Sequence, residues 1–87
     1  MVSRQSLVTE GDIRAWCLDY LLTTLKLPAR WVHPEVKFSR MGMDSAMAVY
    51  FVMALEEWLE TELPPEVLYE RTTVSDLARH LAGAARA

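Results

Sequence analysis

Apolar residues return every three or four positions in three stretches of the chain, the spacing that one face of an α-helix produces. The first stretch follows Thr9, whose hydroxyl can cap a helix while the acid three positions later reaches back to the chain. Pro28 ends this predicted helix at about Lys26 or Leu27. Its inward face is predicted to consist of Ile13, Trp16, Cys17, Tyr20, Leu21 and Leu25.

The second stretch predicts a helix from Ser45 to Glu60, with Asp44 at the capping position before it. One face can fill a core and carries Ala48, Phe51, Val52, Leu55 and Leu59. The opposite face carries Ala46, Tyr50, Met53 and Glu57. The first two turns are therefore apolar on both sides, and the register that buries one face turns the other toward solvent.

The third stretch begins at a second T-x-x-D start, Thr73 to Asp76, and is predicted to stop at Gly83. Its apolar face consists of Val74, Leu77, Ala78 and Leu81. These positions again follow the period of an α-helix.

The connections between the stretches differ in length. Prolines break the chain at residues 64–65, and residues 66–70 can form one short helix that turns Val67 and either Leu68 or Tyr69 inward. Residues 28–43 form a much longer connection, and a loop of this length needs an anchor or a function. Its candidate anchors are Val32, Val36 and Phe38.

The whole pattern predicts an all-α domain with three substantial helices, one short third helix and a long loop between the first two helices. The large apolar residues predicted to be buried together are Trp16, Leu21, Phe51, Leu55, Leu59, Leu77 and Leu81. We expect residues 1–8 to be a flexible lead, residues 9–83 to be the domain and residues 84–87 to be a tail.

Composition and charge narrow the function classes. The 87 residues suffice for one domain, and the net charge of −3 is unevenly distributed along the chain. From Asp44 to Glu70 the chain has no Lys or Arg, and its acids are Asp44, Glu56, Glu57, Glu60, Glu62, Glu66 and Glu70. This block argues against nucleic-acid binding and suits a basic protein partner, although a solvated helix face would look the same.

The sequence gives no sign of membrane insertion or secretion. No apolar run approaches the roughly 18–20 residues that a membrane span needs, and residues 1–6 have no apolar signal core. Cys17 is the only cysteine, so an internal disulfide is excluded, and a lone thiol fits a cytoplasmic protein.

Most catalytic and metal-binding patterns are absent. His33 and His80 have no metal-ligand or nucleophile–base spacing, and Cys17 lies on an apolar helix face, as an inert buried thiol does. We therefore predict no catalytic residue and no metal site.

One candidate site remains, at the junction of the long loop and the second helix. Gly42 permits a turn, Asp44 can cap the helix, and Ser45 lies in the first turn, where backbone amides favour a phosphate. No base lies beside Ser45, which favours a serine that another enzyme modifies. Taken alone, Asp44-Ser45 would be better explained as a simple helix cap, because Asp-Ser is common at helix starts.

Five separated segments give this site a context. The segment from Phe38 to Ser45, FSRMGMDS, resembles the F-x-x-[LM]-G-x-D-S signature of acyl carrier proteins. Residues 47–49, MAV, are similar to the run that follows the serine in polyketide synthase carrier domains. Residues 53–57, 63–65 and 72–78 resemble later segments of the same family. The resemblance covers about residues 9–82.

The resemblance implies an antiparallel four-helix bundle with a short third helix. It also implies that Ser45, next to Asp44 and Gly42, receives 4′-phosphopantetheine from coenzyme A through a magnesium-dependent phosphopantetheinyl transferase. The arm then carries acyl groups as thioesters to partners such as a ketosynthase or an acyltransferase. The resemblance places the partner surface on the second helix and beside the serine, at Met43, Ala46, Met47, Tyr50, Met53, Glu57 and Glu60. Tyr50 stands where related polyketide carriers usually have Glu.

The interpretation that results is a freestanding, monomeric, non-catalytic acyl carrier of polyketide or related specialised biosynthesis, with no nucleic-acid or membrane partner. Two alternatives stay open. A peptidyl or aminoacyl carrier would use the same Ser45, and an unmodified helical adaptor would not use it at all.

Overall fold

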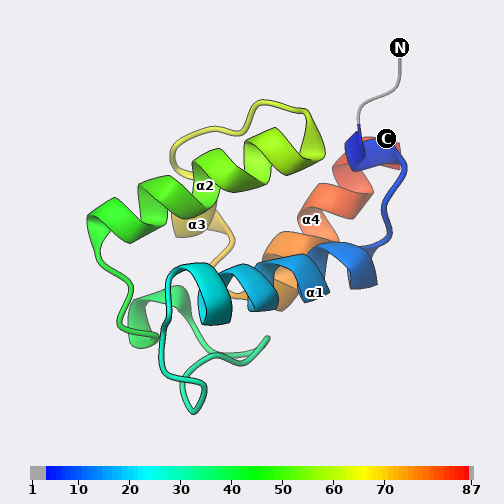
Figure 1. The fold of residues 1–87 in the computed structure, drawn as a ribbon. Helices are drawn as coiled ribbons and strands as arrows, with labels where there is room; N and C mark the ends of the chain where they lie inside the picture. Colours follow the sequence, from blue (N-terminus) through cyan, green and yellow to red (C-terminus); the bar gives the residue numbers. More distant parts are fainter. Residues whose placement is uncertain (1–3, 87) are drawn as a thin grey trace.

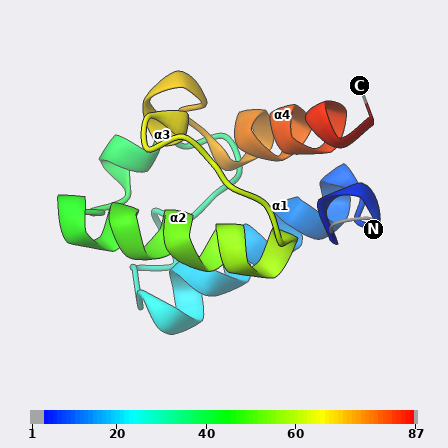
Figure 2. The ribbon, with the colours of Figure 1, turned by 90° about the horizontal axis from the view of Figure 1, so that it is seen from above.

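The computed structural model describes residues 4–86, and this part of the chain is helical without a β-strand (Figure 1). The α-helices are α1 (Glu10–Asp19), α2 (Ser45–Leu59), α3 (Val67–Glu70) and α4 (Val74–Arg86). Shorter helical segments are η1 (Arg4–Ser6), η2 (Tyr20–Thr24) and η3 (Phe38–Arg40). Figures 1 and 2 show α2 and α4 running against the direction of α1. The predicted all-α bundle with a short third helix is confirmed.

The predicted helix starts are confirmed by their hydrogen bonds. The Asp12 N–H donates to Thr9 Oγ1 over 3.1 Å, and the Thr9 N–H donates to the Asp12 carboxylate over 3.0 Å, which completes a capping box. At the start of α4, the Asp76 N–H donates to Thr73 Oγ1 over 3.1 Å. Side chains close in sequence fix these starts, and for this reason the sequence predicts them well.

Two predicted helix ends are wrong. The first helix ends before Lys26, because Lys26 takes a left-handed backbone (φ 55°) that lets the Leu27 N–H donate to the Leu21 carbonyl over 3.0 Å. This turn also buries Leu27. α4 continues past Gly83 to Arg86, because Gly83 keeps a helical backbone, and a glycine permits a stop without requiring one. Most of the predicted tail is therefore helical, and residue 87 lies outside the described range.

The predicted lead contacts the ends of two helices. The Arg4 N–H donates to Glu60 Oε1 over 3.2 Å, and Gln5 Nε2 donates to the Leu81 carbonyl over 2.8 Å. Residues 4–6 thus lie between the end of α2 and α4, while residues 1–3 lie outside the described range. The flexibility of the lead and the domain boundaries stay predictions.

The core forms where α1, α2 and α4 meet. Six of the seven predicted core residues are buried, namely Leu21, Phe51, Leu55, Leu59, Leu77 and Leu81. Trp16 is only half-buried, and this part of the prediction is wrong. Its indole lies at the edge of the core, where it stacks on Trp58 at 5.0 Å and on Tyr20 at 5.2 Å between ring centroids. The wide ring packs against the core and stays partly exposed.

The long connection is anchored, as its apolar residues predict. Phe38 is buried, and its N–H donates to the Thr72 carbonyl over 2.9 Å. Further back, the Ser75 N–H donates to the Pro34 carbonyl over 3.0 Å. Val32 and Val36 are partly buried against the core. These contacts tie the loop to the start of α4 and thereby fix the point at which α2 begins.

Candidate functional site

A sharp turn of the chain precedes the start of α2. Met41 is buried, and Gly42 then takes a left-handed backbone (φ 84°), which glycine adopts without strain. A Cβ at this position would meet no atom within 4 Å, so the turn needs the conformational freedom of glycine rather than its small size. Asp44 follows in an extended conformation as the cap of α2. The predicted turn at Gly42 and the predicted cap are confirmed.

Ser45 is the first residue of α2 and is exposed. Asp44 Oδ1 accepts the Met47 N–H over 2.8 Å, and the Asp44 carbonyl accepts the Ala48 N–H over 3.0 Å. The N–H groups of Ser45 and Ala46 belong to the first turn, where a helix offers no acceptor of its own. A phosphate on Ser45 would therefore lie beside open amides and the positive end of the helix dipole.

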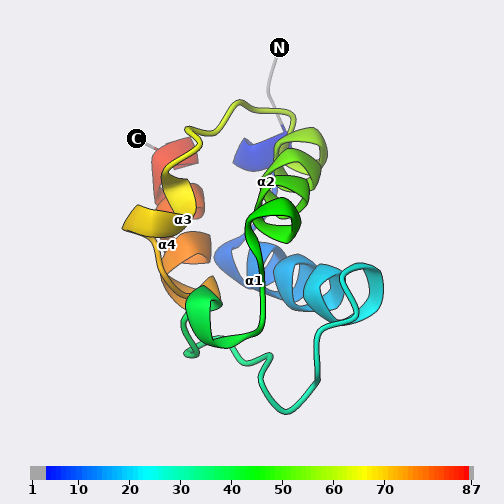
Figure 3. The same cartoon turned by 90° about the vertical axis from the view of Figure 1, so that its left-hand side faces the viewer.

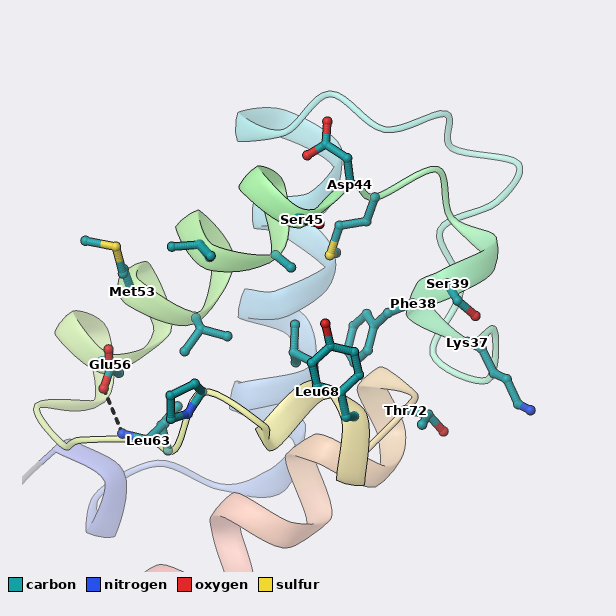
Figure 4. Close-up of a pocket in the computed structure, with 16 residues that line it drawn as sticks. Lys37, Phe38, Ser39, Asp44, Ser45, Met53, Glu56, Leu63, Leu68 and Thr72 are labelled. Carbon is teal, nitrogen blue, oxygen red and sulfur yellow. Dashed lines mark hydrogen bonds between the residues drawn. The ribbon is translucent and has the colours of Figure 1, made fainter.

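A cleft of about 780 Å³ opens beside this serine, between α2 and α3 (Figure 4). It begins at Asp44 and Ser45, and Glu56 and Leu63 lie at its other end. Its apolar lining includes Phe38, Met43, Ala48, Val49, Val52, Met53, Pro65 and Leu68. Figure 3 shows α3 on the left and α2 to its right, with α1 below them.

The cleft corrects part of the predicted helix face. Ala48 and Val52 were expected in the core, yet both are only partly buried because they line the cleft. The reason is that α3 has four residues and cannot cover the side of α2 that faces it. Of the short helix, Val67 turns inward, Leu68 is partly buried, and Tyr69 is 84% exposed at the cleft.

The outer face of α2 is placed as the register predicts. Tyr50 is 60% exposed and Met53 is 58% exposed, and Ala46, Glu57 and Glu60 are exposed as well. Met43 and Met47 are partly buried beside them. The Glu60 carboxylate is already engaged by the Arg4 N–H. The predicted exposure of Ala46, Tyr50, Met53, Glu57 and Glu60 is confirmed, while the role of this face in partner binding stays a prediction.

Three residues of this region were missed by the sequence analysis. Val49, Tyr69 and Glu56 all line the cleft. Val49 is 56% exposed. Val49 could have been found, since it lies one turn after Ser45 and one turn before Met53 on the same helix. The places of Tyr69 and Glu56 depend on how α3 sits relative to α2, which no local pattern encodes.

The other reactive side chains lie away from the cleft. Burial raises the pKa of the Cys17 thiol from 9.0 to about 12, so the thiol stays protonated at neutral pH, as an inert buried cysteine does. His33 Nδ1 accepts the Glu35 N–H over 3.3 Å, and His80 is exposed on α4. Within residues 4–86 no group of three or more His, Cys, Asp or Glu is arranged to hold a metal ion. No helix in the same range is long and apolar enough to span a bilayer.

Comparison with known proteins identifies the family. A family model described as "Phosphopantetheine attachment site" matches residues 16–81. The chain belongs to this phosphopantetheine-binding family. Its cofactor is 4′-phosphopantetheine, which this family holds through a covalent bond. The matched range contains the whole of α2 and α3 and the cleft between them.

Curated relatives of this family member are large synthases. One phenolphthiocerol/phthiocerol polyketide synthase protein of Mycobacterium tuberculosis (strain H37Rv) is 32% identical over 77 residues, which is 88% of this chain and 4% of that protein. The 6-methylsalicylic acid synthase of Penicillium terrestre is 36% identical over 58 residues, which is 67% of this chain and 3% of that protein. The chain thus spans only a few per cent of the length of these relatives.

Solved structures with a similar fold are carrier proteins. An acyl carrier protein from Anabaena sp. PCC 7120 superposes with a TM-score of 0.79 at 24% identity, covering 98% of this chain and 97% of that one. A free-standing peptidyl carrier protein from Acinetobacter baumannii gives a TM-score of 0.77 at 24% identity, covering 87% of this chain and 95% of that one. At this identity the likeness establishes the fold, which is the predicted carrier fold.

Proposed function

We propose that the chain is an acyl carrier of polyketide or related specialised biosynthesis and that Ser45 holds its 4′-phosphopantetheine. The observation that carries this proposal is an exposed serine at the start of α2, directly at the mouth of an apolar cleft. The other serines of the matched range are less suitable. Ser75 is buried, and Ser39 lies in the short η3 segment rather than at the start of a long helix.

The residues at this site fit the arm. The Ser45 hydroxyl is open to a transferase, and the first turn of α2 offers N–H groups to the phosphate. Asp44 holds that turn in place through the Met47 N–H. The thiol of the bound arm would supply the thioester linkage for acyl groups. The apolar walls of the cleft would then cover part of an acyl chain against water.

The polyketide assignment is supported by the named synthases among the curated relatives. In this proposal the partners are a phosphopantetheinyl transferase, then a ketosynthase, an acyltransferase or other acyl-processing enzymes. They would contact the exposed face of α2, where the apolar stripe of Tyr50 and Met53 ends in Glu57. The proposal includes a monomeric, cytoplasmic carrier that is the substrate of these enzymes and has no catalysis of its own.

One loading experiment tests this proposal. The protein is incubated with coenzyme A, Mg²⁺ and a broad-specificity transferase, and its intact mass and its proteolytic fragments are measured. We expect one added arm, located on the fragment that contains Ser45. The loaded protein is then offered to an acyltransferase with malonyl-coenzyme A and, separately, to adenylating enzymes with amino acids.

The outcomes separate the three interpretations. Acyl loading without aminoacyl loading supports the acyl carrier. Aminoacyl loading alone would replace it with a peptidyl carrier, which the fold comparison at 24% identity does not distinguish from an acyl carrier. An arm on Ser39 would show that the wrong serine has been assigned. A folded protein that accepts no arm would be an adaptor.

A further inference from the structure

One side chain of α2, that of Glu56, lies at the far end of the cleft. Glu56 Oε2 accepts the N–H of Leu63 over 2.8 Å, although the two residues are seven positions apart (Figure 4). The carbonyl of the same glutamate accepts the Thr61 N–H over 3.1 Å. Glu56 thus holds the connection between α2 and α3 through both its main chain and its side chain.

This contact lies in a wall between two hollows of the surface. We call this wall, which Met53 and Glu56 form, the partition. Leu63, which the hydrogen bond holds in place, is partly buried and lines the cleft. A second, shallower hollow lies on the other side, formed by Met53, Glu56, Glu57, Glu60, Thr61 and Glu62. Met53 and Glu56 line both spaces, so they form the wall that separates them.

The partition has a defined place relative to Ser45. At the rise of an α-helix, Glu56 lies about 16 Å along α2 from Ser45. The middle of the cleft is apolar, whereas this end presents a carboxylate that already accepts an N–H. An apolar chain that extends to the partition would have to displace Leu63 and break its hydrogen bond to a charged acceptor, which is costly when the N–H finds no replacement.

We infer that Glu56 determines the length of the acyl chain that the cleft accepts. This inference rests on the proposed attachment of the arm at Ser45. Short apolar chains occupy the cleft up to the partition, and longer chains stop there or break it. Removing the Glu56 side chain joins the cleft to the second hollow and admits longer chains.

Matched variants separate the effect of the hydrogen bond from the effects of charge and of folding stability. Glu56→Gln keeps a side-chain oxygen that can accept the Leu63 N–H, while Glu56→Ala removes both the acceptor and the wall. Glu35→Ala is the control, because it removes the same charge from an exposed position that lines neither space. No acyl-processing enzyme is present when the melting temperatures and resonances are measured.

The experiment uses a ladder of saturated acyl-coenzyme A donors from butyryl to dodecanoyl. A broad-specificity transferase places each acyl arm on each variant, and intact mass confirms complete loading. The melting temperature of every acyl form is compared with that of the same variant bearing the bare arm, so a general loss of stability cancels. In wild type the gain in melting temperature should rise with chain length and then fall.

The turning point is the chain length at which the gain in melting temperature begins to fall. Glu56→Ala should move this turning point to a longer acyl chain. Glu56→Gln and Glu35→Ala should keep the wild-type turning point. As a second readout, the amide resonance of Leu63 in wild type should move at the chain length of the turning point and stay still below it. A turning point that is the same in wild type and Glu56→Ala would overturn the inference, as would an equal shift in Glu56→Gln.

Failure of the inference is distinguishable from failure of the proposed function. If every variant loads at Ser45 but no chain length changes the melting temperature or the Leu63 resonance, the cleft takes no acyl chain. The inference is then wrong and the attachment site stands. If mass spectrometry finds no arm on Ser45, both are wrong.

Discussion

The two sides of α2 carry similar apolar residues but meet different neighbours. Toward α1 and α4, Phe51 and Leu55 are buried, and Phe51 stacks on Trp16 at 6.3 Å between ring centroids. Toward α3, Ala48 and Val52 remain partly open and line the cleft. The difference lies in the partner elements, because α3 is too short to cover its side. An apolar helix face therefore becomes a core or a binding surface according to what the rest of the chain places against it.

The largest effect is expected on the packed side. Leu55→Ala should lower the free energy of unfolding by about 2–5 kcal/mol, because it leaves a cavity among fully buried neighbours. This is a large share of the stability of a small domain. Urea unfolding followed by circular dichroism measures it. A loss under about 1 kcal/mol would mean that Leu55 does not face the core.

The start of α2 belongs to neither side, and a smaller effect is expected there. Asp44→Ala should cost about 1 kcal/mol, because the Met47 N–H loses its acceptor. Asp44→Asn is the matched control, since its side-chain oxygen can still cap the helix. If both variants unfold at the same urea concentration as wild type, the cap contributes nothing to stability.

On the cleft side the cost of truncation should be smaller still. Val52→Ala should lower the free energy of unfolding by less than about 1 kcal/mol, because the side chain is only partly buried and borders space that already exists. The same urea experiment measures this value. A cost as large as that of Leu55→Ala would show that the cleft is closed in solution and that the two sides of α2 are equally packed.

The smallest effect on stability is expected on the outer face. Tyr50→Glu should change the free energy of unfolding by no more than about 0.5 kcal/mol, because Tyr50 is 60% exposed. Transfer of the acyl group to the cognate partner enzyme should fall about tenfold in kcat/KM if Tyr50 contributes about 1.4 kcal/mol to that contact. Arm attachment by a broad-specificity transferase is the control. Equal transfer rates for the two proteins would remove Tyr50 from the recognition surface.

The sequence predicts best those features that neighbouring residues fix. The capping box of Thr9 and Asp12, the cap at Asp44 and the register that exposes Tyr50 all depend on contacts within a few positions. The left-handed turn at Lys26 was not predicted, because it depends on the Leu27 N–H reaching Leu21 and on the burial of Leu27.

The remaining errors have a common cause in tertiary packing. The partial burial of the Trp16 indole and of Val52 is set by helices that pack against them from elsewhere in the chain. At the site, the signature around Ser45 is readable along the sequence, whereas the partition at Glu56 is not. Its hydrogen bond to Leu63 exists only because the chain turns back after α2.

The most direct measurement of the central claim is the intact mass of Ser45→Ala after incubation with coenzyme A, Mg²⁺ and a broad-specificity transferase. Ser45 is exposed in the first turn of α2, so the variant should keep the circular dichroism spectrum of wild type and unfold within about 1 kcal/mol of it. We predict one arm on wild type and none on the variant. An arm on the folded Ala variant, at the same level as on wild type, would contradict the assignment of Ser45.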